Sequence, residues 1–136
     1  MTEYTLVARI PTITEYGALR RLSGLSEKTQ EAAARGLPNT LFAVVIENGG
    51  DAMSMGRVTG DGGTAYQLID IAVLPEHQGK GLGKRIVGAL VDWLHANAPK
   101  SAYVSLIADG PAKDLYAQFG FEPTAPASIG MALWIT

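Results

Sequence analysis

Apolar residues recur along this chain at two spacings, and each spacing predicts a different kind of element. Short apolar runs and weak alternation, bounded by Gly, Pro, Asn or Asp, are typical of β-strands. A repeat every three or four residues, clearest at Leu82, Ile86, Leu90 and Leu94, predicts an amphipathic helix that ends before Pro99. The pattern predicts strands over residues 4–9, 41–46, 52–59, 65–74, 103–108 and 129–135.

Two further helices are predicted between the first two strands. Thr12 and Glu15 have the spacing of a capping box, in which each side chain bonds the backbone N–H of the other, so a helix is expected as far as residue 23. Ser26 is suited to cap a second helix over residues 27–35. The element order is then one strand, two helices, three strands joined by turns, and a helix, strand, helix and strand. This order indicates a mixed α/β fold, with Gly56 as a candidate bulge.

Length and composition bound the class of protein. The 136 residues suit one compact domain over residues 1–136, and a 47% hydrophobic content is enough for a core. A net charge of −2 argues against a nucleic-acid or anionic-membrane partner. The absence of cysteine excludes disulfides and thiolate chemistry, and two histidines do not make a typical zinc site. The sequence has no signal-peptide pattern and no apolar stretch long enough for a membrane span, so a soluble cytoplasmic protein is expected.

The segment LIDIAVLPEHQGKGLGKR, residues 68–85, carries the strongest functional signal. An apolar strand ends at a proline, and Gln78, Gly79, Gly81 and Gly83 follow just before the amphipathic helix. Glycines allow the backbone to come close to a ligand, and a helix N-terminus presents free N–H groups and a positive dipole. The segment therefore predicts a binding site for a phosphate or pyrophosphate.

Two common nucleotide motifs do not fit this loop. A Walker loop requires Ser or Thr directly after its Gly-Lys pair, and none follows here. A Rossmann fingerprint has G-x-G-x-x-G and an acidic residue about 20 positions later. Here the glycines are spaced G-x-G-x-G, and the next acidic residue, Asp92, lies inside the helix. A nucleotide-binding regulatory domain is therefore disfavoured.

A second motif lies about thirty residues farther on. Residues 112–121 read AKDLYAQFGF, with Tyr116 near the middle. Pro111 is well placed in the first turn of a short helix, and Gly120 is well placed to end it. Taken alone, Tyr116 could be an ordinary core residue beside Phe119 and Phe121. Its position after a matching phosphate loop favours a functional role.

Together the two motifs resemble those of the GNAT superfamily of N-acetyltransferases, Q/R-x-x-G-x-G/A and A-x-x-L-Y-x-x-x-G-F. The resemblance implies a GNAT-like α+β fold with a mostly antiparallel central sheet flanked by helices. It also implies acetyl-CoA as the co-substrate, with no metal. The strand before the loop would pair with the coenzyme arm, and the loop would hold its pyrophosphate. Asp109 stands where the family often has a coenzyme-contacting Asn. The expected coenzyme-binding residues are Ile71, Ala72, Val73, Gln78, Gly79, Lys80, Gly81, Leu82, Gly83, Lys84 and Asp109.

The resemblance further implies acetyl transfer to an amine by direct attack in a ternary complex, with Tyr116 as the general acid. A phenol with a pKa near 10 holds its proton at neutral pH and can donate it. The acceptor is expected to be a small-molecule or peptide amine, and a homodimer is left open. A non-catalytic module that binds or senses acyl-CoA on the same fold is the alternative.

Several residues are candidates for the general base. Gln67 cannot act as a base, and His77 is expected to be structural because it lies at the outer corner beside the loop. Asp70 is on the coenzyme strand, and Glu27 or Glu31 could reach the acceptor side. A relay of bound water is an equal alternative to these carboxylates.

Overall fold

The computed structural model describes residues 3–136. Contacts within the chain group into two compact units, the first extending to Leu106 and the second comprising Ile107–Thr136. The first unit contains the whole sheet and three of the four α-helices assigned in the described residues. The second unit is short and contains the segment that carries Tyr116.

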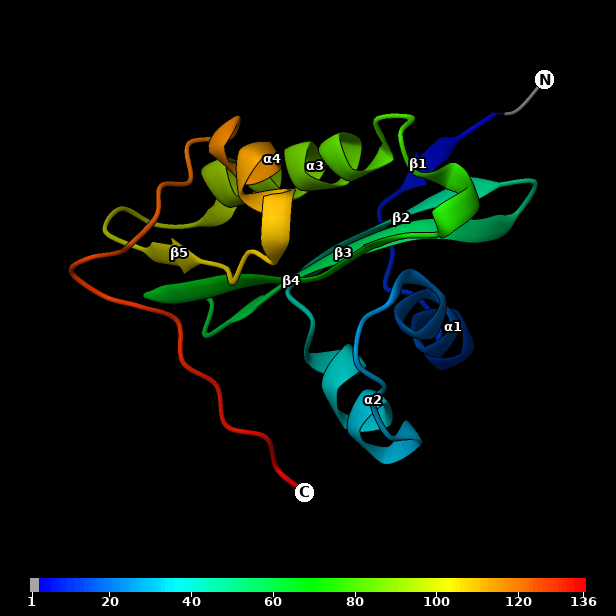
Figure 1. Ribbon diagram of the computed structural model, residues 1–136, viewed down its shortest axis with the longest axis horizontal. Helices are drawn as coiled ribbons and strands as arrows, with labels where there is room; N and C mark the ends of the chain where they lie inside the picture. Colours follow the sequence, from blue (N-terminus) through cyan, green and yellow to red (C-terminus); the bar gives the residue numbers. More distant parts are fainter. Residues whose placement is uncertain (1–2) are drawn as a thin grey trace. The chain divides into compact units, whose positions relative to one another are not determined.

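The first unit is built on a five-stranded sheet whose strands follow one another in chain order (Figure 1). Neighbouring strands are antiparallel from β1 to β4, and β4 and β5 are parallel. The mostly antiparallel α+β sheet predicted from the sequence is therefore confirmed. The strands are β1 Thr5–Val7, β2 Phe42–Asn48, β3 Asp51–Gly60, β4 Ala65–Val73 and β5 Tyr103–Ser105.

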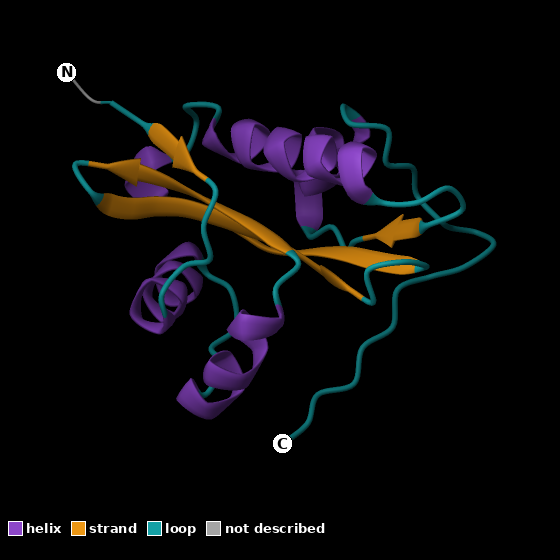
Figure 2. Ribbon diagram, turned by 180° about the vertical axis from the view of Figure 1, so that it is seen from behind, coloured by secondary structure: helices purple, strands orange, loops and turns teal. Residues whose placement is uncertain are grey.

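Helices cover both faces of this sheet (Figures 1 and 2). The helix α3, Leu82–Asn97, lies on one face and buries the apolar side of its predicted repeat. The helices α1, Ile13–Ser23, and α2, Gln30–Gly36, lie on the other. The short 3-10 helices η1, Leu37–Asn39, and η2, Pro75–His77, follow α2 and β4. The core beneath α1 and α2 is formed by Tyr16, Leu19, Ala33, Leu37, Val45, Met55 and Ala72.

One predicted helix begins later than its sequence signal indicated. Thr12 and Glu15 form both bonds of the capping box, as predicted. However, α2 is capped by Thr29 and not by Ser26. The reason is a competing partner: the hydroxyl and the carbonyl of Ser26 both accept hydrogen bonds from the Arg20 guanidinium, at 3.0 and 2.7 Å. Ser26 therefore anchors α1 and leaves the capping role to Thr29.

The second unit contains the 3-10 helix η3, Gly110–Ala112, and the helix α4, Lys113–Ala117. Pro111 lies in the first turn of η3 and Gly120 adopts a φ of 92° after the helix, as the sequence predicted. The predicted strand over residues 129–135 is wrong, because none of the described residues after α4 is in a strand. The strand expected over residues 103–108 also ends early, at Ser105. A segment is a strand only where a neighbouring segment pairs with its backbone in a regular ladder, which a local apolar pattern does not ensure.

A β-bulge interrupts β4 at Asp70. Met55 pairs with Ala72 and Arg57 with Ile69, so two residues of β4 oppose Gly56 alone. Asp70 adopts a φ of 58°, in the left-handed region that side chains other than Gly, Asn and Asp rarely enter. The sequence had suggested a bulge at Gly56, but the extra residue belongs to the facing strand.

Gly56 has a different role, which is to let α3 pack closely on the sheet. A Cβ atom there would lie 2.4 Å from Ile86 Cγ2 and 2.9 Å from Ile71 Cδ1. These distances are far shorter than van der Waals contact. Glycine is therefore required at this position by space, since its φ is not in the left-handed region.

A buried ion cluster surrounds the bulge. Asp70 Oδ1 accepts hydrogen bonds from Arg20 Nη1 at 2.5 Å and from the Tyr16 hydroxyl at 3.3 Å, and Asp70 Oδ2 accepts from Arg57 Nε at 2.8 Å. The exposed fractions of the Arg20, Asp70 and Arg57 side chains are 9%, 5% and 7%. Thr40 accepts a further bond from Arg57. The cluster joins α1, β3 and β4 at the point where β4 changes its backbone conformation.

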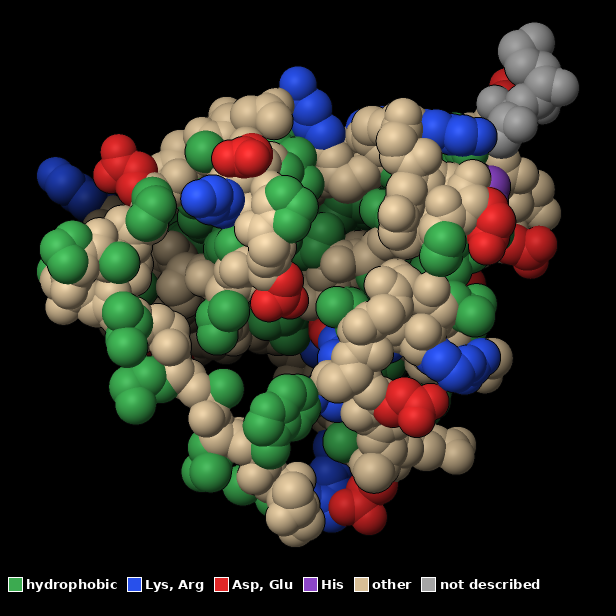
Figure 3. Space-filling model, in the orientation of Figure 1, with side chains coloured by type: hydrophobic (Ala, Val, Ile, Leu, Met, Phe, Trp, Pro, Cys, Tyr) green, Lys and Arg blue, Asp and Glu red, His purple; other side chains and the backbone are tan. Residues whose placement is uncertain are grey.

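The surface carries charges of both signs. Figure 3 shows Lys, Arg, Asp and Glu side chains interspersed over α1 and α2 on the face that it displays. This distribution agrees with the small net charge of −2. Among residues 3–136, no helix is both long and apolar enough to cross a membrane.

Replacing Gly56 with Ala is expected to lower the free energy of unfolding by about 1–3 kcal/mol, because the added methyl group forces Ile86 and Ile71 apart. Gly17→Ala, in α1, is the matched control, since nothing lies within 4 Å of a Cβ atom there. Alanine stabilises a helix interior by roughly 0.5–1 kcal/mol relative to glycine, so the control should be neutral or stabilising. Urea unfolding measures both, and equal stabilities would contradict the tight packing.

Replacing Asp70 with Ala is expected to destabilise the protein by about 3–5 kcal/mol, because two buried guanidinium groups lose their shared counter-ion. Asp70→Gly also removes the carboxylate but tolerates the positive φ. The glycine variant should therefore be more stable than the alanine variant by roughly 1–2 kcal/mol. A glycine variant as stable as the original protein would show that the ion cluster contributes nothing.

Candidate functional site

One edge of β4 is only partly paired. Residues 65–67 pair with residues 103–105 of β5, and the register ends there. Residues 68–73 have no partner strand on that side within the described part of the chain. Their backbone N–H and C=O groups on that edge can bind an extended ligand by strand-like hydrogen bonds. Ile71, Ala72 and Val73, predicted from the sequence, lie in this stretch.

The glycine loop follows β4 in the chain, and the single turn of η2 lies between the two. The Gln78 side-chain amide donates a hydrogen bond to the Val73 carbonyl at 3.0 Å, which fixes the loop against the end of the strand. Gly79 and Gly81 have φ values of 76° and 79°, a conformation that favours glycine. The predicted residues of β4 and of the loop are thereby brought to the same end of the sheet.

The loop ends in the N-terminus of α3. Gly81 is its N-cap, and the first intrahelical bond runs from the Arg85 N–H to the Gly81 carbonyl at 3.1 Å. The N–H groups of Leu82, Gly83 and Lys84 precede that bond and therefore have no intrahelical acceptor. No acidic side chain lies in the first turn and no side chain caps it. The free N–H groups and the helix dipole make this end of α3 suited to an anion.

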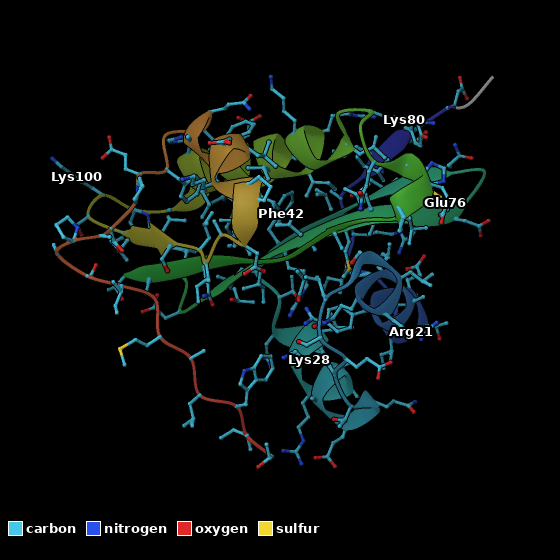
Figure 4. The ribbon with its side chains drawn as sticks, viewed as in Figure 1. Arg21, Lys28, Phe42, Glu76, Lys80 and Lys100 are labelled. Carbon is cyan, nitrogen blue, oxygen red and sulfur yellow. The ribbon has the colours of Figure 1, made fainter. Side chains whose placement is uncertain are left out.

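Tyr4 borders the loop, although no motif in the sequence had pointed to it. Its hydroxyl shares a hydrogen bond with His77 Nδ1 at 2.7 Å, its carbonyl accepts from Arg85 at 3.2 Å, and its ring lies 5.9 Å from Lys80 Nζ. The His77 ring also meets the Tyr4 ring edge-on. Figure 4 shows Lys80 on the loop and Glu76 on η2 at this end of the sheet. The contact ties the start of the chain to the loop.

The carboxylates considered as general bases differ in their surroundings. Asp70 is held between two arginines and is 5% exposed. Glu31 forms an exposed ion pair with Arg35 on α2, and Glu27 is exposed. Gln67 lies in the paired part of β4, opposite Ser105. The Asp70 carboxylate is thus occupied by its two ion pairs. These partners could not be predicted from the sequence because Arg20 and Arg57 come from distant segments.

Tyr116 and Asp109 belong to the second unit. The Tyr116 side chain is buried, and its ring meets the Phe121 ring at a centroid distance of 6.2 Å. Burial raises the pKa of the Tyr116 phenol above 10, and the nearby charge of Asp109 raises it further. The phenol therefore keeps its proton at neutral pH. Asp109 directly precedes η3 and makes no side-chain capping bond to it.

The described residues contain no group of three or more His, Asp or Glu side chains that could hold a metal ion. The hydrogen-bond donors at the end of β4 include the backbone N–H groups of the loop, the Gln78 amide and the lysines of the loop, and Glu76, His77 and Tyr4 border them. This donor set suits phosphate and amide groups.

The family model for the acetyltransferase (GNAT) domain matches residues 38–123, which include β4, the loop and α4. A curated relative, GCN5-related N-acetyltransferase 2, chloroplastic, from Arabidopsis thaliana, is 37% identical over 79 residues. That match covers 58% of this chain and 30% of the relative. The chain therefore spans about a third of the length of the curated relative.

Solved structures give the same fold. SA2161 from meticillin-resistant Staphylococcus aureus, described as a probable acetyltransferase of unknown function, is 46% identical with a TM-score of 0.93, over 98% of this chain and 100% of that one. The GNAT family N-acetyltransferase YhbS from Escherichia coli, solved in complex with CoA, is 21% identical with a TM-score of 0.72, over 92% and 72% of the two chains. From its motifs, its fold and the family match, this chain belongs to the GNAT family of acetyltransferases.

Proposed function

We propose that this protein transfers an acetyl group from acetyl-CoA to an amine, by direct attack within a ternary complex. The observation that carries the proposal is the continuity of two binding features. The open edge of β4 runs directly into a glycine loop that ends in a free helix N-terminus. Acetyl-CoA has an extended amide-bearing arm followed by a pyrophosphate, so its groups occur in the same order as the strand edge and the glycine loop.

The residues at the end of β4 fit such a ligand. The backbone of Ile71, Ala72 and Val73 would pair with the amide-bearing arm. The N–H groups of Gly79 through Lys84 would hold the pyrophosphate, and the ammonium groups of Lys80 and Lys84 would add positive charge. Gln78 orients the loop through its bond to Val73. Asp109, in the second unit, would accept one further hydrogen bond from the coenzyme.

The chemistry requires few groups from the protein. Acetyl-CoA supplies an acetyl group activated as a thioester. The acceptor amine must lose its proton, because an alkylamine with a pKa near 10 is mostly protonated at pH 7. Since Asp70 is committed to two arginines, a water relay is the proton route most compatible with its surroundings. Tyr116 would give its proton to the departing thiolate.

The acceptor is proposed to be a small molecule or a peptide. The net charge of −2 and the interspersed surface charges (Figure 3) do not favour an acceptor bound to nucleic acid. The chain has no cysteine to carry an acetyl group, which favours direct transfer.

Gly81→Glu is expected to weaken CoA binding at least about tenfold, because it adds a negative charge and a strained backbone at the helix N-terminus. Gly50→Glu is the matched control: its φ of 87° is close to the 79° of Gly81, but it lies in the turn between β2 and β3. Titration calorimetry with CoA measures both variants. Equal affinities in folded variants would contradict binding at the loop.

Tyr116→Phe is expected to lower kcat by about 10²- to 10⁴-fold and to leave CoA affinity nearly unchanged, since the ring still packs and only the proton donor is lost. Release of the CoA thiol measures turnover across a panel of amines, and the absence of cysteine keeps the protein silent in this assay. An unchanged kcat, under conditions where chemistry limits the rate, would indicate that Tyr116 only packs in the core and is not the general acid. No thiol release with any amine would favour a non-catalytic acyl-CoA sensor.

A further inference from the structure

Tyr4 contacts the glycine loop and the elements on both sides of it, although it precedes His77 by 73 residues. Its hydroxyl shares a hydrogen bond with His77, which belongs to η2 before the loop. Its ring lies 5.9 Å from the Lys80 ammonium nitrogen, within the loop. Its carbonyl accepts a hydrogen bond from Arg85, in the first turn of α3. One residue at the start of the chain therefore spans the whole length of the loop.

The loop forms few bonds of its own. The Gln78 N–H donates to the Pro75 carbonyl, and the Arg85 N–H donates to the Gly81 carbonyl. Within the part of the chain that the structure describes, no backbone N–H between these two has a hydrogen-bond acceptor. A glycine backbone loses more conformational freedom on being fixed than any other. Side-chain contacts from outside the loop therefore decide how well it keeps its shape before a ligand binds.

Tyr4 is well placed to supply such a contact. The next residue, Thr5, pairs with Glu47 of β2, so the sheet holds the backbone beside Tyr4. The Tyr4 ring is partly buried and meets the His77 ring edge-on, with 5.6 Å between the ring centroids. A tyrosine has only two side-chain torsions, so holding it in place costs little conformational entropy. Both ribbon views show β1 beside the loop (Figures 1 and 2), and Figure 4 shows Lys80 there.

We propose that Tyr4 is a positioning residue for the coenzyme, which holds the unliganded glycine loop in the conformation that binds the pyrophosphate. This inference rests on the function proposed above, because it concerns the same loop. The hydroxyl fixes η2 at the start of the loop, and the ring confines the flexible Lys80 side chain by a cation–π contact. The ligand then does not have to order these groups itself. Such preorganisation lowers the cost of binding without adding a contact to the ligand.

Two substitutions separate the contribution of the hydroxyl from that of the ring. Tyr4→Phe removes only the bond to His77, whereas Tyr4→Leu also removes the ring beside Lys80. Both variants keep the backbone carbonyl that accepts from Arg85. The dissociation constant for CoA, measured by titration calorimetry, should rise about twofold to tenfold for Tyr4→Phe, and further for Tyr4→Leu. In a His77→Leu background, Tyr4→Phe should have no further effect, because the hydroxyl has already lost its partner.

Turnover separates positioning from catalysis. The contacts of Tyr4 described above all lie at the pyrophosphate end of the site. Tyr4→Leu should therefore raise the KM for acetyl-CoA and change kcat by less than about twofold. Tyr103→Leu is the matched control, since it makes the same change on β5, at the opposite edge of the sheet, where the ring is 60% exposed. It should leave CoA affinity unchanged.

A second measurement needs no ligand. NMR relaxation gives order parameters for the backbone amides of Gly79, Gly81 and Gly83 in the protein without CoA. Tyr4→Leu should lower them from the value of a rigid backbone, about 0.85, toward the values below about 0.6 that mark a flexible one. Tyr103→Leu should leave them unchanged. Urea unfolding shows how far each substitution changes the stability of the whole protein.

The results distinguish a failure of this inference from a failure of the proposed function. Absence of CoA binding to the original protein would overturn both. Equal CoA affinity in the original protein and folded Tyr4→Leu, or a loop equally ordered in both, would overturn the role of Tyr4 and leave acetyl transfer intact. A loss of stability in urea with unchanged affinity and order would show that Tyr4 has only a structural role. If Tyr4→Leu does not fold, Tyr4→Phe decides by the same criteria, because it keeps the ring.

Discussion

The buried ion cluster at Asp70 is the constraint on which the site depends. One carboxylate is held by a guanidinium from α1 and another from β3, and its own backbone adopts a left-handed conformation within β4. Breaking a buried ion pair leaves an uncompensated charge, so the three groups hold one another in place. The bulge lies within the unpaired stretch of β4, so the same contacts that hold α1 on the sheet also fix the backbone that a ligand would meet.

Because this cluster fixes the backbone of β4, main-chain groups and side chains have different roles at the end of the strand. At the end of β4 the available donors are mostly main-chain groups, namely the strand edge, the glycine loop and the first turn of α3. Such donors are positioned by the fold and not by rotamers. The side chains around them, such as Gln78 and Tyr4, contact the loop from outside. A binding site of this kind tolerates wide variation in side chains while keeping its geometry.

Local signals in the sequence predicted what is decided locally. The capping box at Thr12, the glycine loop before α3 and the short helix at Tyr116 all form where they were expected. Features decided by distant residues were not predictable. Ser26 has the sequence of a cap, but Arg20 occupies its acceptors. Residues 129–135 have the pattern of a strand, but a strand also requires a neighbour, which a local pattern cannot reveal.

The bulge at Asp70 also changes how insertions and deletions in β4 should be understood. Tyr66 contacts Trp93 on the α3 side, whereas Ala72, six positions later, belongs to the core beneath α1 and α2. In a regular strand, residues six positions apart would face the same side. The extra residue therefore reverses the phase of β4 partway along its length. Deleting one residue between Tyr66 and Ala72 would leave them five positions apart, and residues an odd number of positions apart in a regular strand face opposite sides, so both ends of β4 would keep their cores. Such a deletion would instead remove the bulge that places Asp70 between its two arginines, so the cost would fall on the ion cluster and not on the packing of the strand ends.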